Sequence, residues 1–132
     1  MDTVRIGILG AARIAPSAVI KPAANIGEAV IGAVAARDRG RAETFASKHG
    51  IPRVCDSYAA LVADPALDAI YNPLPNGLHA EWTIAALEAG KHVLCEKPFT
   101  ANADEARAVA DARRRVAPTR WSVGHASALC QF

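Results

Sequence analysis

The chain has 132 residues, of which 52% are hydrophobic and 5% aromatic, and its net charge is +2. This length allows one domain with a core of its own, and the apolar content excludes a disordered chain. The chain contains no apolar run long enough for a membrane span and no signal-peptide pattern at its N-terminus. Its three cysteines are far apart and lack metal-ligand spacing with the histidines. We therefore expect reduced thiols, no structural metal and a cytoplasmic protein.

Apolar runs and helix signals alternate along the chain. Five buried strands are predicted, at residues 4–9, 29–36, 53–55, 67–72 and 92–95. Helices are predicted between and after them, at about 13–22, 38–49, 57–62, 76–90 and 102–114. Short links between alternating strands and helices predict a doubly wound, right-handed parallel α/β sheet.

Local signals set the expected ends of these helices. Pro16 suits the first turn of the first helix, whereas Pro22 is expected to end or bend that helix. The other helices are expected to begin at side-chain caps, namely Asp38, Ser57, Asn76, and Asn102 paired with Glu105. In the helix after Asn76, the expected apolar face consists of Leu78, Trp82, Ala85 and Ala89.

The last twenty residues differ in charge from the rest. Every acidic residue lies at or before Asp111, whereas residues 113–132 carry four arginines and no acid. Two interpretations of this atypical basic tail stay open. In the first interpretation, residues 121–124 form a sixth strand. In the second, the tail is foreign to the fold, as a truncated or frameshifted end would be. Nucleic-acid binding through so short a basic cluster has little support. We divide the chain into a domain at 1–112 and a tail at 113–132.

The turn after the first strand begins at Gly10 and continues through Ala11, Ala12, Arg13 and Ile14 to Ala15. A dinucleotide fingerprint has glycine at its first, third and sixth positions, and here alanine occupies the third and sixth. The motif alone also fits an ordinary strand–turn–helix. Its place between a strand and a helix favours a phosphate site at the helix N-terminus.

The end of the second strand bears on the choice between NAD and NADP. Enzymes that use NAD place a carboxylate there for the ribose hydroxyl groups, and here that position is Ala36. Arg37 follows, with Arg39 and Arg41 nearby, and a guanidinium binds phosphate well. We therefore expect NADP. The alternative is that Arg37 is only a surface charge and that Asp38 binds the ribose of NAD.

Two further segments lie at the carboxyl ends of predicted strands, where ligands bind in open α/β sheets. The first is a rigid polar loop at 72–79, in which His79 is more plausibly structural than functional. The second is Glu96-Lys97-Pro98, in which Glu96 can pair with Lys97 and Pro98 fixes the chain direction. A lysine held beside a carbinol can orient the hydroxyl group and shuttle the hydroxyl proton during hydride transfer. The alternative is that Lys97 is an ordinary surface lysine.

These segments resemble those of the Gfo/Idh/MocA oxidoreductases. Their residues are most similar to those of the dihydrodiol and xylose dehydrogenase branch. The resemblance covers about residues 3–112, and its parts are Gly7 to Ala15, Ala36 to Asp38, Pro75 to His79 and Ala89 to Pro98. It implies an N-terminal Rossmann domain that binds NAD or NADP. In that family a C-terminal α/β domain follows, which provides substrate contacts, a further catalytic histidine and usually the oligomer interface. The resemblance seen in this sequence does not extend to that domain.

The resemblance also implies roles for particular residues. Lys97 is the catalytic lysine, and the residues around the cofactor are Gly10, Ala12, Arg13, Ile14, Arg37, Pro75, Asn76, His79, Glu96, Lys97 and Pro98. The implied reaction transfers hydride between NADP and a sugar, polyol or diol. The alternative is a non-catalytic dinucleotide-binding module or a defunct fragment. For the chain by itself we expect no turnover, no nucleic-acid or membrane partner, and self-association through an uncovered face.

Overall fold

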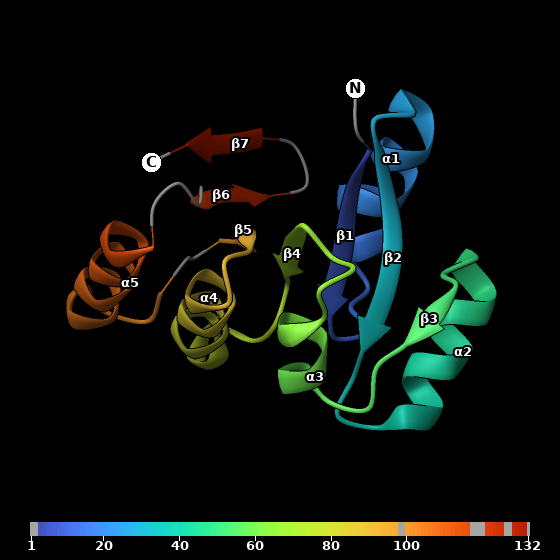
Figure 1. The fold of residues 1–132 in the computed structure, drawn as a ribbon, viewed down its shortest axis with the longest axis horizontal. Helices are drawn as coiled ribbons and strands as arrows, with labels where there is room; N and C mark the ends of the chain where they lie inside the picture. The colour runs from blue at the N-terminus through green and yellow to red at the C-terminus, as the bar shows by residue number, and fades with distance from the viewer. Residues whose placement is uncertain (1–2, 98–99, 117–120, 126–127, 132) are drawn as a thin grey trace.

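The computed structural model describes residues 3–97, 100–116, 121–125 and 128–131. The strands form one seven-stranded sheet in the order β3-β2-β1-β4-β5-β6-β7 (Figure 1). Their bounds are β1 Val4–Leu9, β2 Ala29–Ala35, β3 Arg53–Val54, β4 Ala69–Asn72, β5 His92–Glu96, β6 Trp121–His125 and β7 Ala128–Gln131. The helices are η1 Pro16–Ile20, α1 Lys21–Ile26, α2 Arg39–His49, α3 Tyr58–Ala63, η2 Asn76–Leu78, α4 His79–Glu88 and α5 Ala103–Arg115.

The predicted doubly wound α/β fold is confirmed. Strands β1 to β6 pair in parallel, and only β7 runs antiparallel, against β6. The sheet order begins at β1 and grows first toward β3 and then toward β5, which is the dinucleotide-binding arrangement. Strand β6 forms where the sequence left two interpretations open, and β7 was not predicted. The division of the chain at residue 112 stays a prediction.

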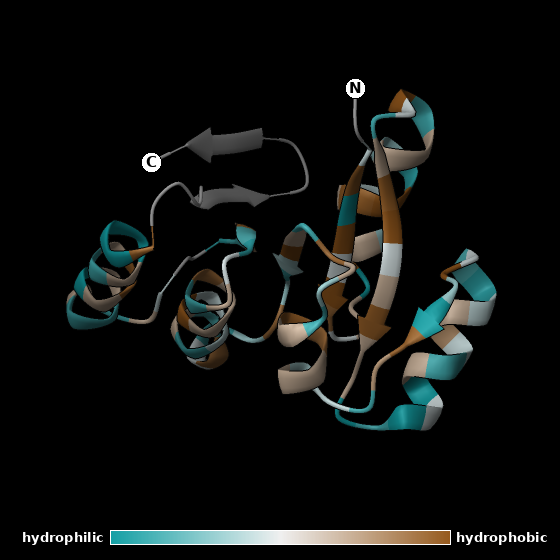
Figure 2. Ribbon diagram, in the orientation of Figure 1, coloured by the Kyte–Doolittle hydropathy of each residue, from teal (hydrophilic) through white to brown (hydrophobic). Residues whose placement is uncertain are grey.

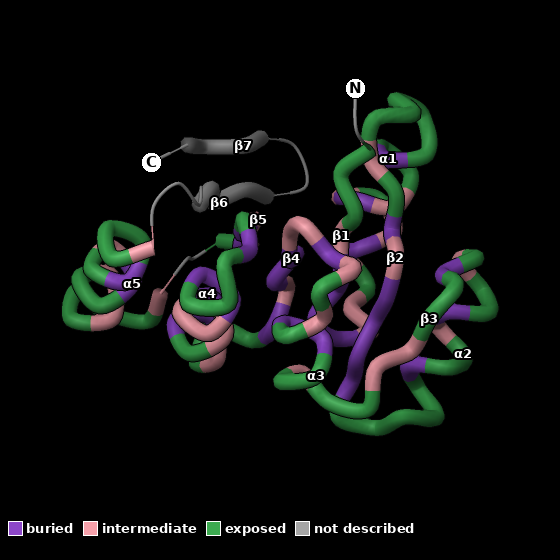
Figure 3. Tube along the Cα trace, viewed as in Figure 1, coloured by how far each residue is buried: buried purple, intermediate pink, exposed green. Residues whose placement is uncertain are grey.

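The sheet has an apolar core on each face. One core packs β1, β2 and β4 against η1, α1 and α2, through residues such as Ile8, Val19 and Ala46. The other packs the sheet against α3, α4 and α5, through residues such as Leu61, Leu87 and Val109. Hydrophobic residues accordingly concentrate on β1 and β2, while the outer sides of α2 and α5 are polar and exposed (Figures 2 and 3).

Several predicted helix ends are correct, and two are wrong. The side chains of Asp38, Ser57 and Asn102 accept hydrogen bonds from amides in the first turns of α2, α3 and α5. Asn76 does not cap α4, which instead follows a 3-10 turn and has no side-chain cap at its start. Pro22 does not end the first helix, because a π-helical turn precedes it and leaves it in the first turn of α1. There its missing N–H costs no hydrogen bond.

The buried face of α4 also differs from the prediction. Its fully buried residues are His79, Ala80, Thr83, Ala86 and Leu87. Leu78, Trp82 and Ala85 are only half-buried at the edge of the core, and Ala89 is exposed. The helix is thus rotated toward its small and polar residues. This rotation brings His79 and Thr83 against the end of β4.

A buried lysine holds the opposite edge of the sheet. Lys91 is 7% exposed, and its Nζ donates to the backbone carbonyls of Asp64 at 2.6 Å and Leu67 at 2.7 Å. These bonds fix the segment between α3 and β4 to the start of β5.

Within the described ranges, none of the helices has the length and hydropathy that a membrane crossing requires.

Candidate functional site

The turn after β1 requires glycine at its first position. Gly10 has a φ of +88°, and its amide donates to the carbonyl of Ala35 at 2.6 Å. A Cβ at this position would lie 3.2 Å from Cδ2 of Leu74. The turn is therefore both left-handed and closely packed against the loop after β4, which a side chain would disturb.

The residues after Gly10 present their backbone amides at a helix start. The backbone amides of residues 11–14 donate no hydrogen bond to any backbone or side-chain atom of the described residues. The π and α turns from Pro16 to Ile26 follow without a break. Unsatisfied amides and the helix dipole favour an anion there, so this turn fits the pyrophosphate of a dinucleotide.

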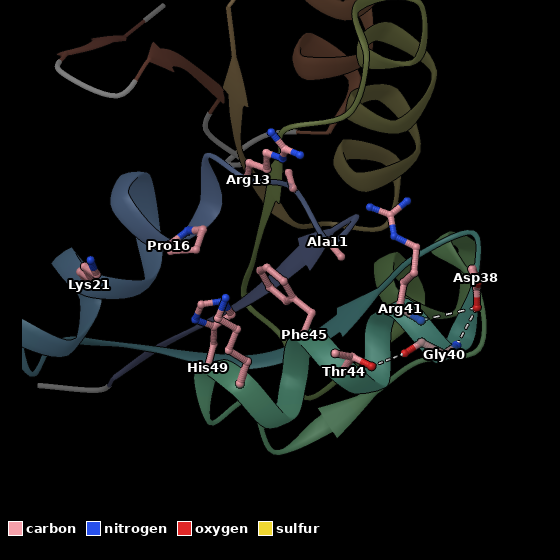
Figure 4. A pocket seen from close by; sticks show the side chains of 12 residues that line it. Ala11, Arg13, Pro16, Lys21, Asp38, Gly40, Arg41, Thr44, Phe45 and His49 are labelled. Atoms are coloured by element: carbon pink, nitrogen blue, oxygen red, sulfur yellow. Dashed lines mark hydrogen bonds between the residues drawn. The ribbon is translucent and has the colours of Figure 1, made fainter.

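A groove of about 880 Å³ runs from this turn between η1–α1 and α2. Ala11 and Arg13 stand at one end with Arg41, Phe45 lies along the groove, and Lys21 and His49 lie at the other end (Figure 4). Its cationic side chains outnumber its one carboxylate, and they are Arg13, Lys21, Arg41 and Lys48. That carboxylate, Asp38, already accepts from the amides of Gly40 at 2.8 Å and Arg41 at 3.4 Å.

Arg37 lies apart from this groove. It lines a cavity of about 260 Å³ with Tyr58 and Trp82, whose rings meet edge to face at 5.4 Å. Arg39 pairs with Glu43 and Asp56 and lines neither space. The end of β2 thus directs Arg37 and Arg41 to different cavities, which the spacing of three arginines did not indicate.

The loop between β4 and α4 is held by buried polar side chains. Asn72 is fully buried, and its Nδ2 donates to the carbonyl of His79 at 3.2 Å and to Oγ1 of Thr83 at 3.1 Å. Its Oδ1 accepts from the amide of Leu74 at 3.2 Å. His79 is 1% exposed, and its Nε2 bonds the carbonyl of Leu74. These contacts give His79 a structural part in the loop, while Pro75 and Asn76 are exposed.

The predicted lysine lies at a second cavity on the same edge of the sheet. This cavity has a volume of about 380 Å³, and Glu96 and Lys97 from the end of β5 line it. Ile14, Asn76 and His79 line it from the other elements. Lys97 is exposed and Glu96 is half-buried. Pro98, also predicted to contact the cofactor, lies outside the described residues.

Tyr71 contacts Glu96, a lining residue of the Lys97 cavity, and the sequence did not predict that contact. Its hydroxyl donates to Oε1 of Glu96 at 2.6 Å, and the residue is 1% exposed. Burial, and then the bond to the Glu96 carboxylate, raise the pKa of the phenol well above its usual range. Only the strand register could have indicated this pair, since the two residues are 25 positions apart.

The cysteines near this edge are structural. Cys95 is fully buried and burial raises the pKa of its thiol to about 12. Cys55 is half-buried, and burial raises its thiol pKa as well. Both thiols therefore stay protonated at neutral pH, as expected of small core residues.

Comparison with known proteins identifies the fold and its family. The family model described as "Oxidoreductase family, NAD-binding Rossmann fold" matches residues 4–125. The chain belongs to the Gfo/Idh/MocA oxidoreductase family. The match continues through β6, beyond residue 112, where the resemblance seen in the sequence stopped. As a member of this family, the chain is an NAD(P)-binding Rossmann domain.

Relatives of the chain include proteins named as sugar and diol oxidoreductases. The chain is 55% identical over 105 residues to D-xylose 1-dehydrogenase (NADP(+)) 2 of Haloferax volcanii, which covers 80% of this chain and 32% of that protein. It is 48% identical over 84 residues to human trans-1,2-dihydrobenzene-1,2-diol dehydrogenase, covering 63% of this chain and 25% of that protein.

Solved structures agree with this assignment. The chain superposes with a TM-score of 0.86 on KijD10, a 3-ketoreductase from Actinomadura kijaniata in complex with NADP and TDP-benzene, at 33% identity. The match covers 93% of this chain and 37% of that one. The chain spans about a third of the length of the curated relatives that it matches.

Proposed function

We propose that this domain binds NADP in an oxidoreductase that transfers hydride between the nicotinamide and a carbinol of a sugar, polyol or diol. The cavity shared by Lys97, Glu96 and Ile14 carries the proposal. It places a lysine beside the helix that starts at the phosphate turn. The relatives named for sugars and diols support the substrate class.

The residues fit the cofactor at both of its charged parts. The helix start after Gly10 would take the pyrophosphate, because its amides face no described partner. Ala36 is 8% exposed and offers no carboxylate to repel a 2′-phosphate. Arg37 and Arg41 lie on either side of Asp38 in sequence and line different cavities, so each offers a cation for a 2′-phosphate bound on its own side of the loop after β2. The relatives named with NADP support this preference over NAD.

The proposed chemistry of the protein is proton handling by Lys97. The bound nicotinamide supplies the hydride acceptor or donor. In the oxidation direction, the Lys97 amine takes the proton from the substrate hydroxyl while the carbonyl forms. In the reduction direction, the Lys97 ammonium donates to the carbonyl oxygen and then protonates it. Glu96, Asn76 and the loop fixed by Asn72 form the wall that positions these groups.

The alternative is a role in cofactor binding without catalysis. The exposure of Lys97 at its cavity favours this alternative for the chain by itself. Catalysis by positioning requires the reacting groups to be held in one geometry, which can be worth about 7–11 kcal/mol. We therefore propose NADPH binding without turnover by the 132-residue chain. Small-molecule binding without a nucleic-acid or membrane partner, self-association and a cytoplasmic location remain predictions.

Fluorescence titration with NADPH and NADH tests the cofactor. Tighter binding of NADPH is expected, and binding of neither cofactor would refute the proposal. A chimera tests the lysine: this domain replaces the matching third of the Haloferax volcanii enzyme, and NADPH formation is followed with xylose, inositols and trans-diols. In the chimera, Lys97→Ala should reduce turnover by about a hundredfold or more and leave NADPH affinity nearly unchanged. Undiminished turnover would exclude Lys97 as the proton-handling group.

A further inference from the structure

The register of the sheet aligns Tyr71 with the end of the neighbouring strand. In the parallel pair of β4 and β5, Tyr71 lies opposite Leu94. Side chains alternate between the two faces of a strand, so Leu94 and Glu96 point to the same face as Tyr71. Glu96 is thus one pleat nearer the carboxyl edge. A tyrosine ring spans such a diagonal, and its hydroxyl meets Oε1 of Glu96 at 2.6 Å.

The ring of Tyr71 is held by the core below the site. It belongs to the apolar cluster that includes Ile8 and Val34, and Leu94 packs against this cluster. A fully packed ring cannot turn its hydroxyl away without moving that core. The bond to a carboxylate is charge-assisted and shorter than a neutral hydrogen bond. The Glu96 carboxylate is therefore held by a rigid donor.

This fixed carboxylate forms part of the wall of the Lys97 cavity. The bond from Tyr71 occupies one acceptor position of one oxygen, and a carboxylate has about four such positions. The others remain for hydroxyl, amide or ammonium donors in the cavity. The Asn72 contacts hold Leu74 and His79, which line the same cavity, so its lining rests at both places on buried polar side chains of β4.

We infer that Tyr71 is a positioning residue for the nicotinamide half of the cofactor, acting through the carboxylate of Glu96. The inference rests on the proposed function, because it assigns the Lys97 cavity to the nicotinamide nucleotide. It extends the proposal to a residue that does not itself line the cavity. The adenosine half binds through the phosphate turn and the arginines after β2, and Tyr71 has no part in that half.

Two ligands distinguish the halves in an experiment on the 132-residue chain. NADPH occupies both halves, whereas adenosine 2′,5′-bisphosphate occupies only the adenosine half. Affinities are measured for the wild type, Tyr71→Phe, Glu96→Ala and the double variant, by fluorescence for NADPH and by calorimetry for the bisphosphate. Tyr71→Phe keeps the ring and so the packing. Thermal unfolding of each variant shows whether it is folded.

Tyr71→Phe should weaken NADPH binding about threefold to tenfold, as the loss of one hydrogen bond predicts, and leave bisphosphate binding unchanged. In the Glu96→Ala background, where no acceptor for the Tyr71 hydroxyl remains at this position, Tyr71→Phe should cause no comparable further loss. NADPH affinity unchanged in a folded Tyr71→Phe variant would overturn the inference, and so would equal weakening of both ligands. A wild-type chain that binds the bisphosphate but not NADPH would overturn it too, while the adenosine site would stand. Binding of neither would refute the proposed function itself.

Discussion

The variant Gly10→Val tests the proposed phosphate-binding turn at residues 10–15 while leaving the rest of the fold in place. At a φ of +88°, a β-branched residue is in a region that costs about 1–3 kcal/mol. The new Cβ would also lie 3.2 Å from Cδ2 of Leu74, so the loop after β4 must shift by a few tenths of an ångström. We expect a loss of about 1–3 kcal/mol in the free energy of unfolding. NADPH binding should be abolished while most of the helical circular dichroism remains.

A second glycine provides the matched control. Gly27 also has a positive φ, +67°, but a Cβ there would meet nothing within 4 Å, and it ends α1 far from the turn. Gly27→Val should therefore cost a similar free energy of unfolding in urea and leave NADPH affinity intact. If NADPH bound equally well to both variants in fluorescence titrations, the Gly10 turn would not be the phosphate site.

Three further changes test other parts of the structure. Arg37→Asp and Arg41→Asp should each weaken NADPH more than NADH, by about tenfold to a hundredfold for the arginine that contacts the 2′-phosphate; equal losses for both cofactors would contradict selection by charge. Lys91→Met should lower the free energy of unfolding in urea by about 2–4 kcal/mol, since it removes two charge-assisted bonds, and an unchanged urea midpoint would show that these bonds contribute little. Alkylation at pH 8, mapped by mass spectrometry, should modify Cys55 before Cys95, whose buried thiol has a pKa of about 12. Faster labelling of Cys95 would mean that β5 opens readily.

The sequence predicts features that depend on neighbours along the chain. Asp38, Ser57 and Asn102 cap their helices as expected, because a cap needs only amides two or three residues away. Asn76 has the same chemistry but fails as a cap. The turn there is 3-10, and α4 starts only at His79. The tertiary contacts of Asn72 with His79 and Thr83 decide where that helix begins.

Features that depend on strand register were beyond prediction. No spacing pattern connects Tyr71 with Glu96, since the contact requires β4 and β5 to be neighbours in a known register. Among the three arginines after β2, the sequence favoured Arg37 and did not indicate that each has different surroundings. The entry direction of α2 then gives Arg41 to the large groove and pairs Arg39 with Glu43, while Arg37 faces Tyr58.

The placement of the site on one sheet edge follows from topology alone, and it has a consequence for how such a domain can change. Parallel strands bring their carboxyl ends together, so Gly10, Arg37 and Lys97 had to share an edge once the fold was known. The spaces are nevertheless separate, since Lys97 and Arg37 line different cavities. The helix start after Gly10 lines both the large groove and, through Ile14, the Lys97 cavity. On the proposed function, charge changes after β2 therefore alter the choice between NAD and NADP without disturbing the Lys97 cavity. On the same proposal, the chemistry at Lys97 depends instead on the buried polar contacts of β4, and Tyr71→Phe removes one of these contacts while its ring keeps the core packed.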